Sequence, residues 1–181
     1  DDEADLAARL GPVEAEVRKR LGNFIIAEDD QTIEGVILTK LREAGHTLSI
    51  VESFTGGGIA ARLAPLVGAE TVFKRGVVTR EVSGWVSPEG AAASAANIIA
   101  ESGASHALAV LMQLDEGADR PDFGATICIG IADRQGTVSR QARLIGGRDW
   151  VRVGAAELGL DCLRRYLLGL PVDERIDFER R

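Results

Sequence analysis

Hydrophobic and polar positions along the chain first alternate at residues 47–53 (TLSIVES), a pattern that predicts a half-buried β-strand. Three consecutive glycines follow at 56–58, and a small-residue apolar segment at 59–66 then has the composition of a helix. A strand, a glycine-rich turn and a helix in direct succession are typical of a parallel α/β unit. The pattern therefore predicts that residues 47–66 form one such unit.

The rest of the chain continues this alternation of segment types. Further strands are predicted at 76–79, 106–112, 124–132 and 137–145, and helices at 31–44, 88–102 and 149–168. The turn at 133–136 joins two strands closely enough for an antiparallel hairpin. Two helices carry an apolar stripe that should face the core: Ile33, Val36, Ile37 and Leu41 in the first, and Val151, Ala155, Leu158 and Cys162 in the last.

Three parts of the chain differ in composition. Residues 1–30 are charged and alanine-rich, and they predict a connecting helix broken near Gly11 and Pro12, because proline lacks the donor that a helix needs. Residues 31–170 form the expected α/β domain, and 171–181 a surface tail. No apolar run approaches the roughly 20 residues that a membrane-spanning helix requires.

Composition and charge narrow the function. The formal net charge is −7, which disfavours non-specific nucleic-acid binding because an acidic surface repels phosphates. Cys128 and Cys162 lie in apolar segments and are expected to be buried, reduced thiols, as in a cytoplasmic protein. They are too few for a disulfide framework or a zinc site, and we expect no metal site.

The glycine-rich turn is the strongest local signal. Glycines allow the backbone to approach a ligand, and the following helix N-terminus offers free N–H groups and a partial positive charge. A phosphate or carboxylate would suit that position, although a tight structural turn explains three glycines equally well. The turn has neither the lysine of a Walker P-loop nor the spacing of a dinucleotide fingerprint.

Several segments together resemble the CinA C-terminal domain. TLSIVESFTGGGIAARL (47–63) is similar to the family signature, a strand followed by AESCTGG and a helix. The segments at 72–79, 103–110, 124–133 and 146–163 resemble later family blocks in the same order, and the segment before residue 47 resembles the family's connecting region. The resemblance therefore covers about residues 14–168.

The resemblance implies a fold and an activity. The fold would be a three-layer α/β/α sandwich with a mixed sheet, and the family also implies a homo-oligomer. The family includes enzymes that hydrolyse the carboxamide of nicotinamide mononucleotide, with the nucleotide phosphate at the helix after the TGG turn. No cofactor is implied. The ligand-binding residues expected here are Glu52, Ser53, Thr55, Gly56, Gly57 and Arg148.

The residues that carry the family's chemistry are largely replaced. Glu70 stands where the resemblance places a serine, Arg80 where it places a tyrosine, and Phe54 where it places a cysteine. A block with the family's lysine is missing after Arg80, and 111–116 replaces the TGIAGP loop. Amide hydrolysis needs a nucleophile, a base and oxyanion donors. We therefore assign no catalytic residue.

Other residues offer weaker alternatives. Lys74 and Ser83 could form a nucleophilic pair, but a solvated lysine explains Lys74 better. Arg152 lies one turn after Arg148, and the two could approach a phosphate or make surface ion pairs. His46 and His106 are expected to be structural. An acidic loop is expected to be solvated, although hard cations bind such groups: Asp115, Glu116, Asp119 and Asp122.

The sequence thus predicts a non-catalytic CinA-like domain that binds a nucleotide-like ligand or a partner. Two alternatives stay open: an active nicotinamide mononucleotide deamidase with a rearranged site, and an oligomerisation scaffold. Small-residue faces at 91–100 and 155–160 would permit close helix packing between subunits.

Overall fold

The computed structural model describes residues 2–80, 86–115 and 123–174, and the chain divides into two compact units, Asp1–Thr32 and Ile33–Arg181. The first unit holds α1 (Asp2–Leu21) and the 3₁₀ helix η1 (Gly22–Phe24). The predicted break near Gly11 and Pro12 is wrong, since α1 continues through both residues. A proline removes only one N–H, and the hydrogen bonds on both sides of it hold the helix together.

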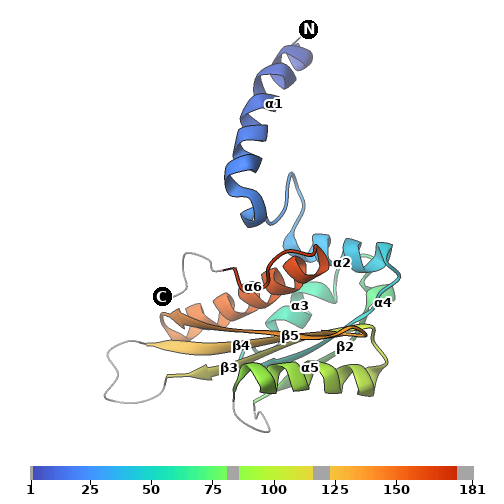
Figure 1. The fold of residues 1–181 in the computed structure, drawn as a ribbon, viewed down its shortest axis with the longest axis vertical. Helices are drawn as coiled ribbons and strands as arrows, with labels where there is room; N and C mark the ends of the chain where they lie inside the picture. The colour runs from blue at the N-terminus through green and yellow to red at the C-terminus, as the bar shows by residue number, and fades with distance from the viewer. Residues whose placement is uncertain (1, 81–85, 116–122, 175–181) are drawn as a thin grey trace. The chain divides into compact units, whose positions relative to one another are not determined.

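The second unit is built on one mixed sheet of five strands, in the order β2-β1-β3-β4-β5 (Figure 1). The strands are β1 (Leu48–Ser53), β2 (Phe73–Thr79), β3 (His106–Leu114), β4 (Gly124–Asp133) and β5 (Gly136–Ile145). β1 runs parallel to β2 and β3, whereas β3–β4 and β4–β5 are antiparallel. The predicted hairpin is confirmed, because Asp133 pairs with Gly136 at its turn.

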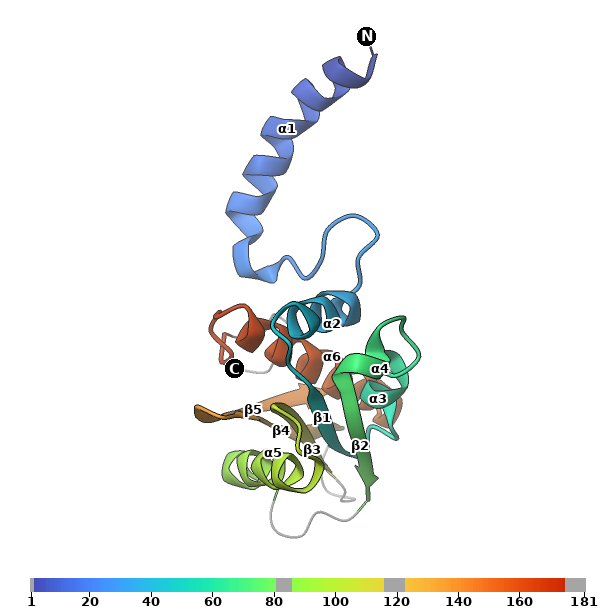
Figure 2. The same cartoon turned by 90° about the vertical axis from the view of Figure 1, so that its right-hand side faces the viewer.

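Helices cover both faces of this sheet (Figure 2). They are α2 (Ile33–Glu43), α3 (Gly58–Leu63), α4 (Ala69–Val72), α5 (Pro88–Ser102) and α6 (Arg148–Leu167). α5 lies on one face, and α2, α3 and α6 lie on the other. The predicted three-layer α/β/α arrangement with a mixed sheet is confirmed. The short α4 and the first three residues of β2 were not predicted, because so few residues carry no readable period.

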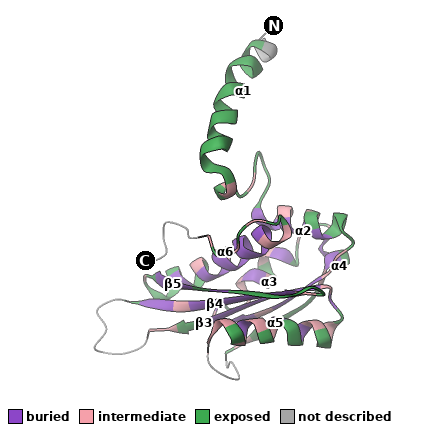
Figure 3. Cartoon of the chain, viewed as in Figure 1, coloured by how far each residue is buried: buried purple, intermediate pink, exposed green. Residues whose placement is uncertain are grey.

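The core lies between the sheet and the α2–α6 layer, and β3 and β4 are buried along most of their length (Figure 3). All four residues of the predicted α6 stripe are fully buried, and both cysteines are buried free thiols, as expected. On the other face, α5 approaches β4 very closely. A Cβ at Gly130 would come within 2.2 Å of the Ala91 carbonyl oxygen, so only glycine fits there.

The prediction that the small-residue face at 155–160 can pack against a second subunit is wrong. The small-residue face at 155–160 is turned inward, and Gly159 packs so closely on β3 that a Cβ would meet the Val110 side chain at 2.6 Å. That face is therefore used inside the chain and is not available to a second subunit. None of the described helices is long and apolar enough to cross a membrane.

Candidate functional site

The glycine-rich turn after β1 is built from left-handed backbone conformations. Gly56 and Gly57 have φ of 71° and 83°, which glycine adopts without cost. Phe54 also has a positive φ, 62°, which is unusual for a residue with a Cβ. Such strain often accompanies a site where the backbone must present a group in a fixed direction. Here it directs the Phe54 ring toward a cavity described below.

The N-terminus of α3, which was expected to hold a phosphate, is occupied by the protein's own Glu52. This carboxylate is fully buried and accepts hydrogen bonds from the N–H groups of Ile59 and Ala60 at 3.1 and 3.0 Å. The Thr55 hydroxyl donates a third bond to it at 2.5 Å. The positive end of the helix is thus already neutralised by an internal anion. The structure does not support a ligand phosphate at this point.

Ser53 and Thr55 also make hydrogen bonds within the chain. The buried Ser53 hydroxyl oxygen accepts a bond from the Met112 N–H at 3.0 Å, which extends the β1–β3 pairing beyond its last backbone pair. Thr55 is buried, and its hydroxyl donates to the Glu52 carboxylate. Glu52, Ser53 and Thr55 thus hydrogen-bond within the chain and fix the turn whose outer surface borders the cavity, and a ligand contact at these residues stays a prediction.

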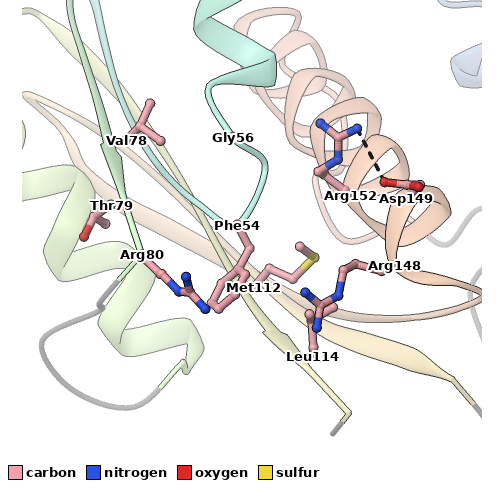
Figure 4. Close-up of a pocket in the computed structure, with 10 residues that line it drawn as sticks. All are labelled: Phe54, Gly56, Val78, Thr79, Arg80, Met112, Leu114, Arg148, Asp149 and Arg152. Atoms are coloured by element: carbon pink, nitrogen blue, oxygen red, sulfur yellow. Dashed lines mark ion pairs between the residues drawn. The ribbon is translucent and has the colours of Figure 1, made fainter.

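That cavity has a volume of about 500 Å³ and opens beside the carboxyl ends of β1 and β2. Its apolar part is formed by Phe54, Met112, Leu114 and Val78, and Figure 4 shows arginines reaching it from two sides. The cavity is within the size range of small-molecule sites. The residues that line it are Phe54, Gly56, Val78, Thr79, Arg80, Met112, Leu114, Arg148, Asp149 and Arg152.

Three arginines line the cavity. Arg80 enters from the end of β2, and Arg148 and Arg152 enter from the first turns of α6. Asp149, the one carboxylate among the described lining residues, lies 3.7 Å from the Arg152 guanidinium. α6 begins after Gly147, which has no side chain to cap it, so the positive end of a 20-residue helix lies at the same place. The described lining of the cavity thus contains three guanidinium groups and one carboxylate, in a protein of net charge −7.

The predicted site residues thus separate into two groups. Gly56 and Arg148 line the cavity; Gly57 faces Val78 beside it, and Glu52, Ser53 and Thr55 lie beneath the turn. Arg80 and Arg152 also line the cavity; the sequence left Arg152 open between a phosphate contact and a surface ion pair, and identified Arg80 only as the replacement of a tyrosine. Their signal was present but ambiguous, since an isolated arginine is usually a surface residue.

The residues that replace the family's catalytic residues also differ in whether they line the cavity. Phe54 lines the cavity, whereas Glu70 is exposed on α4 and does not line it. Lys74 is exposed on β2, as expected for a solvated lysine. Ser83 and most of the acidic loop lie outside the described residues; of that loop, Asp115 is described and forms an ion pair with Arg143 at 2.6 Å. Within the described part of the chain, no group of three acidic, histidine or cysteine side chains could hold a metal ion.

A second polar cluster lies at the opposite end of the parallel strands, near the starts of β1 and β3. The rings of His46 and His106 are 4.4 Å apart, and His106 contacts the Ser105 hydroxyl at 2.9 Å through Nδ1 and Asp133 at 3.9 Å through Nε2. Burial lowers the pKa of His106, the neighbouring His46 acts in the same direction, and Asp133 opposes both. Burial and Asp133 also raise the pKa of Tyr166 to about 12.

This cluster does not form a hydrolytic triad. The Ser105 oxygen accepts a bond from the Thr47 N–H at 2.8 Å and lies 3.1 Å from the Thr47 carbonyl, to which it can donate. The hydroxyl thus ties the start of β3 to the segment before β1 and is held by the fold. The cluster therefore connects these two segments through polar side chains.

Comparisons with known proteins agree with this fold and with the order of its motifs. Residues 30–82 match the family model of the CinA C-terminal domain. The chain is a member of the CinA family. It is 35% identical to a CinA-like protein of Frankia casuarinae over 189 residues, and 36% identical to a putative competence-damage inducible protein of Symbiobacterium thermophilum over 199 residues. These matches cover 96% and 93% of this chain but only 44% and 46% of the relatives.

Solved CinA-family structures show the same fold. A competence or damage-inducible protein from Enterobacter asburiae superposes with a TM-score of 0.66 at 21% identity, covering 76% of this chain and 99% of that one. A competence/damage inducible protein from Agrobacterium tumefaciens gives a TM-score of 0.61 at 25% identity, covering 78% and 99%. The CinA-type chain fold is therefore retained, although the turn carries Phe54 and the cavity carries Arg80.

Proposed function

We propose that this CinA domain binds a small anionic, nucleotide-like ligand in the arginine-lined cavity and does not hydrolyse an amide. The observation that supports binding is the convergence of Arg80, Arg148 and Arg152 on one apolar-floored cavity. Guanidinium groups match phosphate geometry and bind it through charge-assisted hydrogen bonds. An anion there would also benefit from the α6 N-terminus. The site lies at the carboxyl ends of parallel strands, where α/β proteins usually bind ligands.

The absence of hydrolysis rests on the chemistry of the lining residues. Among the described residues that line the cavity, Thr79 has the only hydroxyl and Asp149 the only carboxylate, and Asp149 is next to Arg152. A nucleophile needs a base within hydrogen-bond reach. Ser53 is the nearest serine of the signature, but its oxygen is buried against the Met112 N–H.

The test measures binding and turnover on the same protein. We expect nicotinamide mononucleotide to raise the melting temperature of the full chain without release of ammonia. Arg148→Gln and Arg152→Gln should each weaken binding roughly 10- to 100-fold, the usual effect of losing a hydrogen bond to a charged group. Arg134→Gln is the matched control, because Arg134 is an exposed arginine in the β4–β5 turn.

The other outcomes identify the alternatives. Ammonia release that depends on Arg148 would establish a rearranged deamidase. A chain that neither binds nor turns over the nucleotide would favour the scaffold, an alternative supported by Glu52, which occupies the N-terminus of α3. The predicted homo-oligomer belongs to the same set of proposals, and sedimentation of the full chain tests it.

A further inference from the structure

The helix α1 carries an apolar stripe that nothing in its own unit covers. Leu6, Leu10, Val13 and Val17 are between 46% and 59% exposed. They follow one another at intervals of four, three and four residues, which places them on one face of the helix. None of residues 5–32 is buried, so the described part of this unit has no core of its own.

The same helix has little else to stabilise it. It contains Gly11 and Pro12, two residues that disfavour a helix interior. Its ion pairs, such as Arg9 with Asp5 at 2.9 Å, are exposed i,i+4 pairs, and such pairs contribute little to stability. Helices of this length depend on packing of their apolar face. We therefore expect the stripe to be the surface through which α1 is stabilised.

The stripe has the spacing of a two-stranded coiled coil. Intervals of four and three residues are those of the core positions of a heptad, and each core residue packs between residues of a second helix. Gly11 and Pro12 fall on the opposite face of α1 and do not interrupt the stripe. The pattern therefore fits a second amphipathic helix with the same spacing.

Charge determines which orientation of two such helices is favourable. Residues 1–10 contain four carboxylates and one arginine, whereas residues 11–21 contain two carboxylates and three basic side chains. Parallel pairing would bring the two acidic ends together, and antiparallel pairing brings each acidic end to a basic end. Antiparallel pairing also brings Arg9 beside the partner's Glu16, because both flank the stripe on the same side, seven residues apart.

We infer that α1 is the docking surface for a second copy of this chain, and that the two α1 helices pair in antiparallel orientation. In this pairing Leu10 packs against the partner's Val13, and Leu6 packs against the partner's Val17. Twofold symmetry repeats both contacts, so every layer of the interface joins a leucine to a valine. The inference concerns the N-terminal unit alone and does not depend on ligand binding by the second unit.

The first experiment measures self-association of the full chain by sedimentation equilibrium. Because the interface is small, we expect a reversible dimer with a Kd of about 1–100 µM. Val13→Glu should weaken it at least about 10-fold, since it places a charge in an apolar layer. Glutamate favours a helix more than valine does, so loss of α1 would not explain this result. Val67→Glu is the matched control, because Val67 is 97% exposed and lies in the second unit.

The second experiment tests the orientation by disulfide formation. Leu10→Cys and Val13→Cys chains are mixed and oxidised gently, while the native Cys128 and Cys162 are buried. Antiparallel pairing predicts that the mixed disulfide between positions 10 and 13 forms in preference to either self-linked product. Preferential linkage of each variant to itself would instead indicate parallel helices and would overturn the antiparallel arrangement.

The remaining outcomes overturn the docking surface itself. A chain that stays monomeric up to about 100 µM has no such dimer. A dimer unaffected by Val13→Glu uses another surface. A monomer whose melting temperature falls in Val13→Glu, but not in Val67→Glu, would assign the stripe to contact with the second unit of the same chain. None of these results changes the expected ligand binding, so the proposed function is tested separately.

Discussion

The hydrogen bonds around Glu52 lead to a quantitative prediction about stability. The carboxylate is fully buried and holds three donors: the Thr55 hydroxyl and the N–H groups of Ile59 and Ala60. Glu52→Gln keeps the size of the side chain but replaces one oxygen with an NH₂ group. That group cannot accept, so at least one buried donor loses its partner and faces another donor.

The expected cost follows from these bonds. A hydrogen bond to a charged group contributes about 1.5–3 kcal/mol, and an unsatisfied buried group costs about 1–3 kcal/mol. We therefore expect Glu52→Gln to lower the free energy of unfolding by about 2–4 kcal/mol. For a unit of this size, that corresponds to a melting temperature lower by roughly 5–15 °C. Urea denaturation followed by circular dichroism measures the first quantity and a thermal scan the second.

Glu70→Gln provides the control, because Glu70 is exposed in the first turn of α4 and its neutralisation should change stability by less than about 0.5 kcal/mol. A Glu52→Gln variant as stable as the wild type would refute the assigned role. Ligand binding supplies a second readout. If the ligand sits at the arginines, the folded variant binds it as the wild type does. If the α3 N-terminus is the true anion site, removing the competing carboxylate should tighten binding.

Three further predictions concern the rest of the domain. Gly130→Ala should lower the free energy of unfolding by about 1–3 kcal/mol, measured in urea, because the added methyl would strike the Ala91 carbonyl. The pKa of His106 is lower in the folded than in the unfolded chain, so the unfolded chain binds more protons as the pH falls. The free energy of unfolding should therefore decrease as the pH drops below about 6.5, the ordinary pKa of histidine. His106→Gln should flatten this pH dependence between about pH 5 and 8. Burial raises the pKa of Cys128 to about 11, so this thiol should resist a thiol reagent at pH 8 until the chain is unfolded, when it should react fully.

The elements that the sequence predicted well are those whose pattern is local. The α6 stripe of Val151, Ala155, Leu158 and Cys162 repeats over several turns, and all four residues are buried. The 133–136 turn joins the apolar run at 124–132 to the next predicted strand so closely that only a hairpin connects them. The predicted break at Pro12 was wrong because it was inferred from a single proline, whereas the other backbone hydrogen bonds of the helix persist.

The site was predicted less well, because its geometry depends on residues that are distant in sequence. The signature glutamate was interpreted as a ligand residue, since nothing in the sequence shows that it reaches two N–H groups seven and eight residues later. Arg80 and Arg152 are 72 positions apart, and only the closeness of β2 to the start of α6 brings them to one cavity. Sequence order shows that a turn exists; the fold decides which groups face it.

The position of Glu52 and the positions of the arginines together indicate where a ligand anion should lie. With Glu52 at the N-terminus of α3, the turn itself offers no free positive end to a ligand. The arginines of the cavity lie on the opposite wall, where Arg148 and Arg152 stand at the start of α6, and at the end of β2, where Arg80 lies. A ligand anion should therefore lie toward α6, with its apolar part over the Phe54 ring.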